Sequence, residues 1–291
     1  MPTKKTVGLF VFGSLMVTAL TSSFVLLAPL AARFLRLQFG RWPYWLFATS
    51  SSLALLAFVP QWAFYQAVVL LLVGIFADLE EHKFPLFYTA ISSVSLTVLS
   101  LLLMLTAWAK YKQTTLIPFL KQHINNSLEM AQKLPNFDMK AVDVQQIILL
   151  VPAITSIGLM ILVFLSIVFV KPQTKSQRLT EFRVPDHVIW ALILSTAGVF
   201  LLKTPEYITA QKICLNTLYV VVAGYYFQGL SIVGFFFNKM RINYFLKAGL
   251  FFILGVHLFV FIVGLGLSDL WFNYRSRWYK KEVVNRPSEE P

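Results

Sequence analysis

The chain has 291 residues, of which 57% are hydrophobic and only 13% are charged, whereas a soluble domain carries about a quarter charged residues. A soluble fold of this size could not cover so much apolar surface, so lipid must be the solvent for much of the chain. The net charge of +12 does not indicate nucleic acid, because the basic residues lie in short turns between apolar runs. Positive-inside topology and anionic lipid headgroups explain them there.

The first apolar run covers residues 7–37 and follows Lys4 and Lys5. It resembles a signal peptide, but its apolar character continues too far and its cleavage site is poor, so we expect a retained membrane segment. The run is longer than the roughly 20 residues that one span needs. Two interpretations fit: one long tilted helix, or a span followed by a shorter returning helix kinked near Pro29.

Seven further apolar runs predict membrane segments. They cover residues 44–59, 63–77, 84–108, 147–170, 186–202, 213–237 and 243–268. The sequence therefore predicts an all-α fold, a polytopic transmembrane helical bundle with eight or nine membrane segments. We expect residues 1–291 to form a single integral membrane domain that ends in a polar tail, 276–291.

The polar segment 109–145 contains apolar residues at spacings of three and four, which predict an amphipathic helix. We expect this helix to lie on the membrane surface, and the alternative is a helix that closes over the bundle. The lysines and arginines divide almost evenly between the two sides, so orientation is undecided. We prefer cytoplasmic basic turns at 33–41, 171–183 and 239–247.

Two long runs near the C-terminus each carry one polar residue close to the middle, Gln228 and His257. A polar residue deep in a span is by default a functional hypothesis, here a ligand or proton site. The competing interpretation is an interhelical hydrogen bond, which stabilises by about 0.6 to 2 kcal/mol. We favour the hydrogen bond, because a single histidine without a nearby carboxylate makes a poor proton relay.

Charged residues lie where two of the spans end. Asp269 and Arg275 flank Trp271 in what looks like an interfacial belt, and their spacing of six excludes a helical i,i+4 salt bridge. If they pair, they must bridge to other elements. The run Asp78, Glu80, Glu81 and His82 is better interpreted as a solvated helix cap than as a metal site. Cys214 is the only cysteine, and we expect no metal and no cofactor.

The sequence contains no Walker A loop, no H-E-x-x-H, no G-x-S-x-G and no dinucleotide-binding glycine signature. We therefore expect no enzymatic activity, and an energy-coupled transporter would need a separate ATPase.

Several short motifs resemble the bacterial YybS-like integral membrane family. They are Tyr226-Phe227-Gln228-Gly229-Leu230-Ser231 and the stretch Gly266-Leu267-x-Asp269-x-Trp271-Phe272-x-Tyr274-Arg275, with Phe182-Arg183-Val184-Pro185 upstream. The resemblance makes Gly229, Gly266, Asp269, Trp271 and Arg275 signature residues and implies the bacterial cytoplasmic membrane. The N-terminal half is similar in pattern to S components of energy-coupling-factor transporters and to the rod-shape protein MreD, which implies a related helical fold.

Two functional hypotheses follow. The first is a transport-associated or small-molecule-binding membrane subunit, with its ligand near Gln228 and His257. The second is a non-catalytic membrane scaffold for cell-envelope or morphogenesis machinery. Both have the lipid bilayer as partner, together with other membrane proteins or a separate ATPase.

Overall fold

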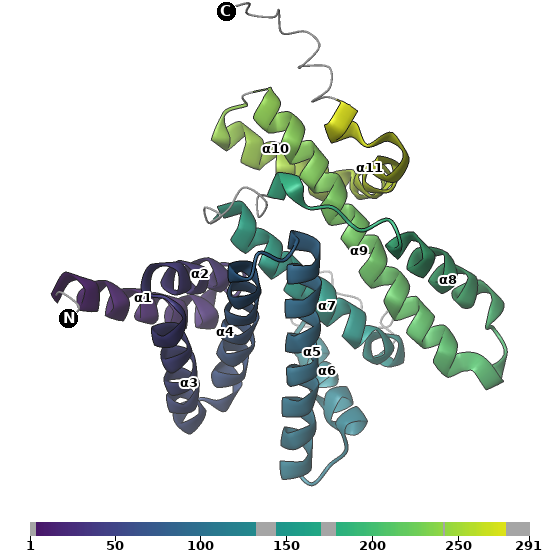
Figure 1. Cartoon of the computed structure of the whole chain (residues 1–291). Helices are drawn as coiled ribbons and strands as arrows, with labels where there is room; N and C mark the ends of the chain where they lie inside the picture. Colours follow the sequence, from purple (N-terminus) through teal and green to yellow (C-terminus); the bar gives the residue numbers. More distant parts are fainter. Residues whose placement is uncertain (1–3, 132–143, 170–178, 241, 278–291) are drawn as a thin grey trace, which may run out of the picture. The chain divides into compact units, whose positions relative to one another are not determined.

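A computed structural model describes residues 4–131, 144–169, 179–240 and 242–277 (Figure 1). The described residues form helices and contain no strand, which confirms the predicted all-α class. Part of the 109–145 loop, most of the basic turn 171–183 and most of the tail 276–291 lie outside the described residues. The chain divides into two compact units, the first comprising residues 1–83 and 89–166 and the second residues 84–88 and 167–291. The placement of both units in a single membrane domain stays a prediction.

The first unit begins with two helices where the sequence shows one apolar run. Helix α1 (Lys4–Ser23) ends before a short turn, and α2 (Ala28–Phe39) begins with Pro29 in its first turn, where a missing N–H costs nothing. Gly40, with φ of +85°, then turns the chain into α3 (Arg41–Phe58). The run 7–37 is therefore broken near Pro29, as the second interpretation expected. Whether it crosses the membrane twice stays a prediction.

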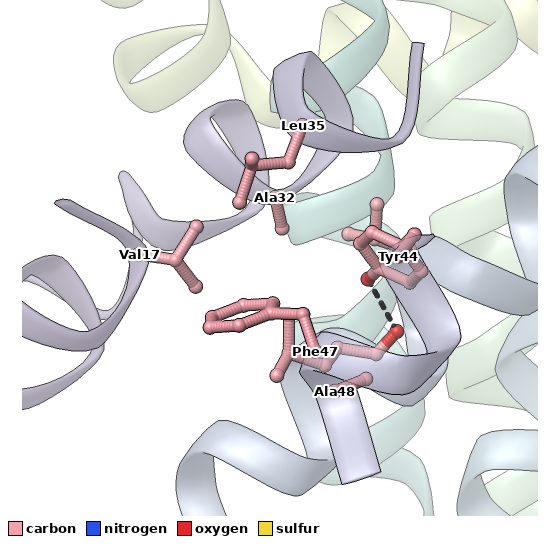
Figure 2. Packing of buried hydrophobic residues seen from close by; sticks show 8 residues of the cluster. Val17, Ala32, Leu35, Tyr44, Phe47 and Ala48 are labelled. Atoms are coloured by element: carbon pink, nitrogen blue, oxygen red, sulfur yellow. Dashed lines mark hydrogen bonds between the residues drawn. The ribbon is translucent and has the colours of Figure 1, made fainter. Parts of the chain in front are cut away.

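Helices α3 and α4 (Pro60–Glu81) form a hairpin joined at Val59. With α1 and α2 they enclose a core of eight buried residues (Figure 2), which are Val17, Ala32, Leu35, Tyr44, Phe47, Ala48, Leu70 and Val73. The Tyr44 hydroxyl donates to the Leu70 carbonyl at 2.6 Å, so the one polar group in this core has a partner. At Gly74, a Cβ would lie 2.6 Å from the Trp45 ring, so glycine is needed for α3 and α4 to pack this closely.

The first unit also holds most of α5 (Leu86–Tyr111), α6 (Leu116–Ala131) and most of α7 (Val144–Phe169). Helix α6 is the predicted amphipathic helix. Its Phe119 is buried, and the rings of Phe119 and His123 lie 5.8 and 6.3 Å from that of Trp108 near the end of α5. Helix α6 thus packs against α5, while its location on the membrane surface stays a prediction.

The second unit is organised around α9 (Ile208–Lys239), its longest helix. The short 3-10 helix η3 (Leu179–Glu181) and α8 (Val188–Leu201) precede it, with η4 (Pro205–Tyr207) at the turn. Helix α8 packs closely against α9. A Cβ at Gly198 would collide with the sulfur of Cys214, so only glycine allows this approach. Gln211 of α9 also donates to the Val199 carbonyl at 3.1 Å.

The last apolar run, 243–268, forms two helices rather than one. Helix α10 (Tyr244–His257) and α11 (Phe259–Phe272) are bent by 92° at Leu258. The break leaves carbonyls in the last turn of α10 without intrahelical donors. The Tyr226 hydroxyl donates to one of them, the Gly255 carbonyl, at 3.0 Å. A side chain of α9 thus supports the break.

Among the described residues, four helices are long and apolar enough to cross a membrane, namely α4, α5, α7 and α9. The number becomes five if α10 and α11 together form one broken span. Helix α8 and most of α1 are apolar but shorter. Eight or nine membrane segments therefore stay a prediction.

Replacing Tyr44 with Phe removes the hydrogen bond that links α3 to the Leu70 carbonyl, which lies inside α4 and keeps only its intrahelical bond. We expect the free energy of unfolding to fall by about 1 kcal/mol, and thermal unfolding of the purified protein in detergent measures it. Tyr65→Phe, at a position 53% exposed on α4, is the matched control and should unfold like wild type. Equal stability of both variants would contradict the role assigned to Tyr44.

Candidate functional site

Each unit contains a buried cluster of charged side chains and their polar partners. In the second unit the cluster centres on Asp269 of α11, which is fully buried. Its Oδ2 atom accepts from Gln228 Nε2 at 3.2 Å and from Arg275 Nη2 at 3.0 Å, and its Oδ1 atom accepts from the Tyr274 backbone N–H at 2.9 Å. We call Gln228, Ser231, Asp269, Tyr274 and Arg275 the Asp269 cluster.

The pair between Asp269 and Arg275 forms because α11 ends between them. Helix α11 stops at Phe272, and Asn273 adopts the left-handed conformation with φ of 44° and ψ of 57°. Asparagine tolerates this conformation better than most residues. The chain turns back there and brings Arg275 beside Asp269, which a continuous helix could not do at a spacing of six.

Arg275 also holds the segment that precedes α8. Its Nη1 atom lies 2.7 Å from the Thr180 carbonyl, 3.1 Å from the Phe182 carbonyl and 3.2 Å from Ser231 Oγ. The Ser231 hydroxyl donates to the Leu179 carbonyl at 2.7 Å. These bonds hold segment 179–184 against α9 and the end of α11. Arg275 therefore bonds to Asp269 and to other elements at once.

Gln228 completes this connection. It is fully buried near the middle of α9, and its Oε1 atom accepts from the Val184 backbone N–H at 2.9 Å while Nε2 donates to Asp269. Both ends of the amide therefore have partners inside the protein. This arrangement includes an interhelical hydrogen bond between α9 and α11, and a ligand contact at Gln228 stays a prediction.

Gly229 and Gly266 allow α9 and α11 to come together at this cluster. A Cβ on Gly229 would collide with the Ile262 carbonyl, and a Cβ on Gly266 would collide with the Tyr225 carbonyl. Small residues permit such close backbone approach between membrane helices. Close packing of the two helices therefore explains why both positions are glycine, without any ligand.

The other two sequence-predicted site residues lie apart from the cluster. His257 is the last residue of α10, and its side chain is exposed. Trp271 is 68% exposed near the end of α11, as a residue of an interfacial belt would be. The structure therefore brings together Gln228, Asp269 and Arg275, and it does not place His257 among them.

The first unit contains a second cluster, which joins α2 to the end of α4. Arg33 Nη2 lies 2.6 Å from Glu80 Oε1, and both side chains are almost completely buried. Arg33 Nη1 donates to the Ser166 hydroxyl of α7 at 3.4 Å. The Arg33 guanidinium also stands 5.1 Å from the centre of the Phe76 ring, a distance at which cation–π attraction contributes.

Arg36 extends this cluster toward the surface. Its Nη2 atom lies 2.7 Å from Asp78 Oδ1 and 2.8 Å from Glu81 Oε1. Asp78 Oδ2 in turn accepts from the Trp45 indole at 3.1 Å and from Arg41 Nε at 3.2 Å. Exposure rises from the buried Arg33 to Arg41, whose side chain is 55% exposed. We call these three arginines, with Asp78, Glu80 and Glu81, the Arg33 cluster.

Sequence reasoning treated the two halves of the Arg33 cluster separately. The arginines were assigned to a basic turn at 33–41 and the acidic residues to a solvated helix cap. Glu81 is partly exposed, but Glu80 is buried and paired. The sequence did contain a signal for this pairing. Arg33 and Arg36 share one face of a helix, and the acidic run ends an adjacent apolar span. Within the described ranges, no three His, Cys, Asp or Glu side chains are arranged to hold a metal ion.

Removing one partner of the pair between Arg33 and Glu80 leaves a charge without its counter-ion inside the protein. We expect Arg33→Leu to lower the free energy of unfolding by about 3 to 5 kcal/mol, and the double variant Arg33→Leu/Glu80→Leu to recover most of that loss. Thermal unfolding in detergent measures both. Arg183→Leu breaks the exposed pair with Asp186 and should change little. A double variant no better than Arg33→Leu would contradict the pairing.

Arg275→Lys tests the Asp269 cluster. One ammonium group cannot reproduce the fork that bonds Asp269, two carbonyls and Ser231 together. We expect a loss of about 2 kcal/mol of unfolding free energy and faster proteolysis near segment 179–184. Arg277→Lys changes an exposed arginine two residues away, which stands 5.6 Å from the Phe272 ring, and serves as the control. Wild-type stability of Arg275→Lys would show that charge alone suffices.

Comparison with known families places most of the chain in one of them. Residues 6–270 match the family described as "Predicted membrane protein (DUF2232)". Comparisons with curated proteins and with solved structures gave no match.

Proposed function

The chain belongs to the DUF2232 family of predicted membrane proteins, and on that premise we propose that it is a multi-pass subunit that binds a small molecule in association with a transport system. We place it in the bacterial cytoplasmic membrane, in keeping with the resemblance to the YybS-like family. The role is non-catalytic, and the sequence offers no recognisable nucleophile–base pair in support of an enzyme.

The observation that carries the proposal is the break between α10 and α11. Non-helical backbone at membrane depth is tolerated only where it is buried in protein or lines a polar cavity. Interrupted helices of this kind form the binding sites of many transporters. Here the break lies beside α9, with Tyr226 donating to the Gly255 carbonyl and its ring 5.0 Å from that of Phe259. The exposed His257 ends α10 at this break, where a ligand can reach its ring.

The number of membrane segments follows from how the shorter helices pack. Helix α3 is not among the four long apolar helices, but it packs along α4, to which Val59 joins it. No charged residue occurs in residues 42–77, and the Arg41–Asp78 contact holds the two open ends of the hairpin together. If α4 crosses the membrane, α3 must return through the same depth. The same reasoning applied to α8, which packs along α9, brings the number to seven if α10 and α11 form one span. The run 7–37 then supplies an eighth segment if it crosses once, or an eighth and a ninth if it crosses twice.

A transport role requires a source of energy outside this chain. The sequence has no nucleotide-binding loop, so the proposed system includes a separate ATPase as partner. Of the basic turns preferred as cytoplasmic, 171–183 and 239–247 are the surfaces that such a partner would contact, because Arg33 and Arg36 of the turn 33–41 are buried and paired.

The Asp269 cluster favours a second function. Its amide, carboxylate and guanidinium groups bond to one another and to backbone, as in a rigid structural element, and not to an open site. A non-catalytic membrane scaffold for cell-envelope or morphogenesis machinery would use such rigidity and would need no ligand.

Mass spectrometry of gently purified protein separates the two functions. We expect a bound small molecule in the wild type, retained in His187→Ala and reduced at least tenfold in His257→Ala. Both histidines are exposed, so neither change should disturb the fold, and His187 serves as the matched control. A wild-type protein that carries no small molecule but retains stable protein partners would favour the scaffold. Equal retention in both variants would move the site away from His257.

A further inference from the structure

The α3–α4 hairpin contains a neutral polar cluster that is separate from both charged clusters. Gln66 of α4 is fully buried, and its Nε2 atom donates to Ser51 Oγ of α3 at 2.8 Å. The Ser51 hydroxyl donates in turn to the Phe47 carbonyl at 2.6 Å. We call Ser51, Ser52 and Gln66 the hairpin polar cluster.

These contacts fix which atom of the Gln66 amide lacks a partner. A serine hydroxyl has one hydrogen, and Ser51 gives it to the Phe47 carbonyl, so Ser51 can only accept from Gln66. Gln66 must therefore turn its nitrogen toward Ser51. Among the described residues, its Oε1 atom is buried without a hydrogen-bond partner. The Oγ atom of Ser52, the residue after Ser51 in α3, is also buried and has no partner in the same part of the chain.

The position of Gln66 in the hairpin limits what the partner can be. Gln66 precedes Asp78 by twelve residues of α4, which is about 18 Å at helical rise, and half of the hydrocarbon core is about 15 Å thick. The amide thus lies near the middle of the bilayer. Residues 42–77 include no charged side chain, so nothing in the hairpin would neutralise a charged ligand at that depth.

We propose that the hairpin polar cluster is a binding site for a small neutral hydrogen-bond donor, which donates to Gln66 Oε1. The donor is either a resident water molecule or a hydroxyl or amide group of a small solute. A buried acceptor without a partner is costly, and buried water commonly satisfies such groups. The proposal rests on the membrane placement proposed above, and it concerns a different unit from the site at His257.

The double variant Ser51→Ala/Gln66→Leu tests the proposal in the full-length protein purified in detergent. It replaces both partners of the internal hydrogen bond by apolar groups, a change that is neutral or stabilising when nothing else is bound. An occupied site loses its ligand as well, so we expect the melting temperature to fall by at least about 3 °C. Gln61→Leu, at an exposed position of α4, is the matched control and should melt like wild type. An unchanged or higher melting temperature in the double variant overturns the proposal.

Ser52→Ala provides an independent and milder test. It removes only a hydroxyl that has no partner among the described residues, so an empty site predicts unchanged or increased stability. A lower melting temperature supports an occupant that also contacts Ser52. Unchanged or higher stability overturns the inclusion of Ser52 in the site.

Two further measurements identify the occupant and separate this proposal from the others. If the donor is a small molecule, mass spectrometry shows a solute that the wild type and His257→Ala release and the double variant does not, whereas a destabilised double variant with the same released solutes as the wild type assigns a water molecule. Resistance of each protein to alkaline extraction reports membrane residence by itself. Extraction of the wild type would refute the membrane placement, while a stable, membrane-resident double variant would refute only the site.

Discussion

Pairing of buried charge is the constraint on which both units depend. An ionised side chain that leaves water without a partner carries a penalty of several kcal/mol, and a chain in which only 13% of residues are charged has few partners to offer. Arg33 and Glu80 meet in the first unit, and Asp269 and Arg275 meet in the second. In each case the arginine fork reaches further acceptors, so that one side chain joins several elements.

Asp78 of the Arg33 cluster and Asp269 occupy equivalent positions along their helices. Asp78 lies in the last turn of α4 and Asp269 in the last turn of α11, and each accepts from an arginine fork and from two further donors. A carboxylate at a helix end can be reached by groups that approach from beyond the helix. The end of a membrane helix is also where charge meets the least hydrocarbon. The same physical requirement has therefore produced similar contacts in two units of different architecture.

Sequence patterns predicted the helices well because composition alone required them, and the family comparison supports the membrane character. They predicted the partners of charged residues poorly. Arg33 looked like part of a basic turn, since its partner Glu80 is 47 residues away and periodicity reports only local neighbours. The spacing of six between Asp269 and Arg275 excluded a salt bridge within one helix. It did not suggest the turn at Asn273, which brings the two side chains together. The bend at Leu258 also left no clear mark, because the run contains no proline and the adjacent His257 was interpreted as a residue in the middle of one continuous span. Such features depend on tertiary contacts, here the hydroxyl of Tyr226.

The contrast between the two units bears on where a ligand would bind. Polar groups of the Asp269 cluster bond to each other and to backbone, which leaves a ligand little to gain there, since it would have to replace bonds already made. In the first unit, the buried Nε atoms of Arg33 and Arg36 and the Oε1 atom of Gln66 have no partner within the described part of the chain. Unpartnered groups of this kind gain most from a bound molecule. The sequence directed attention to the C-terminal half because its motifs are distinctive there, whereas most of the buried side-chain atoms that have no partner among the described residues lie in the N-terminal half, with the Tyr225 hydroxyl as the exception. In this chain, the segments with the most distinctive motifs are therefore different from the segments with most of these buried, unpartnered polar atoms.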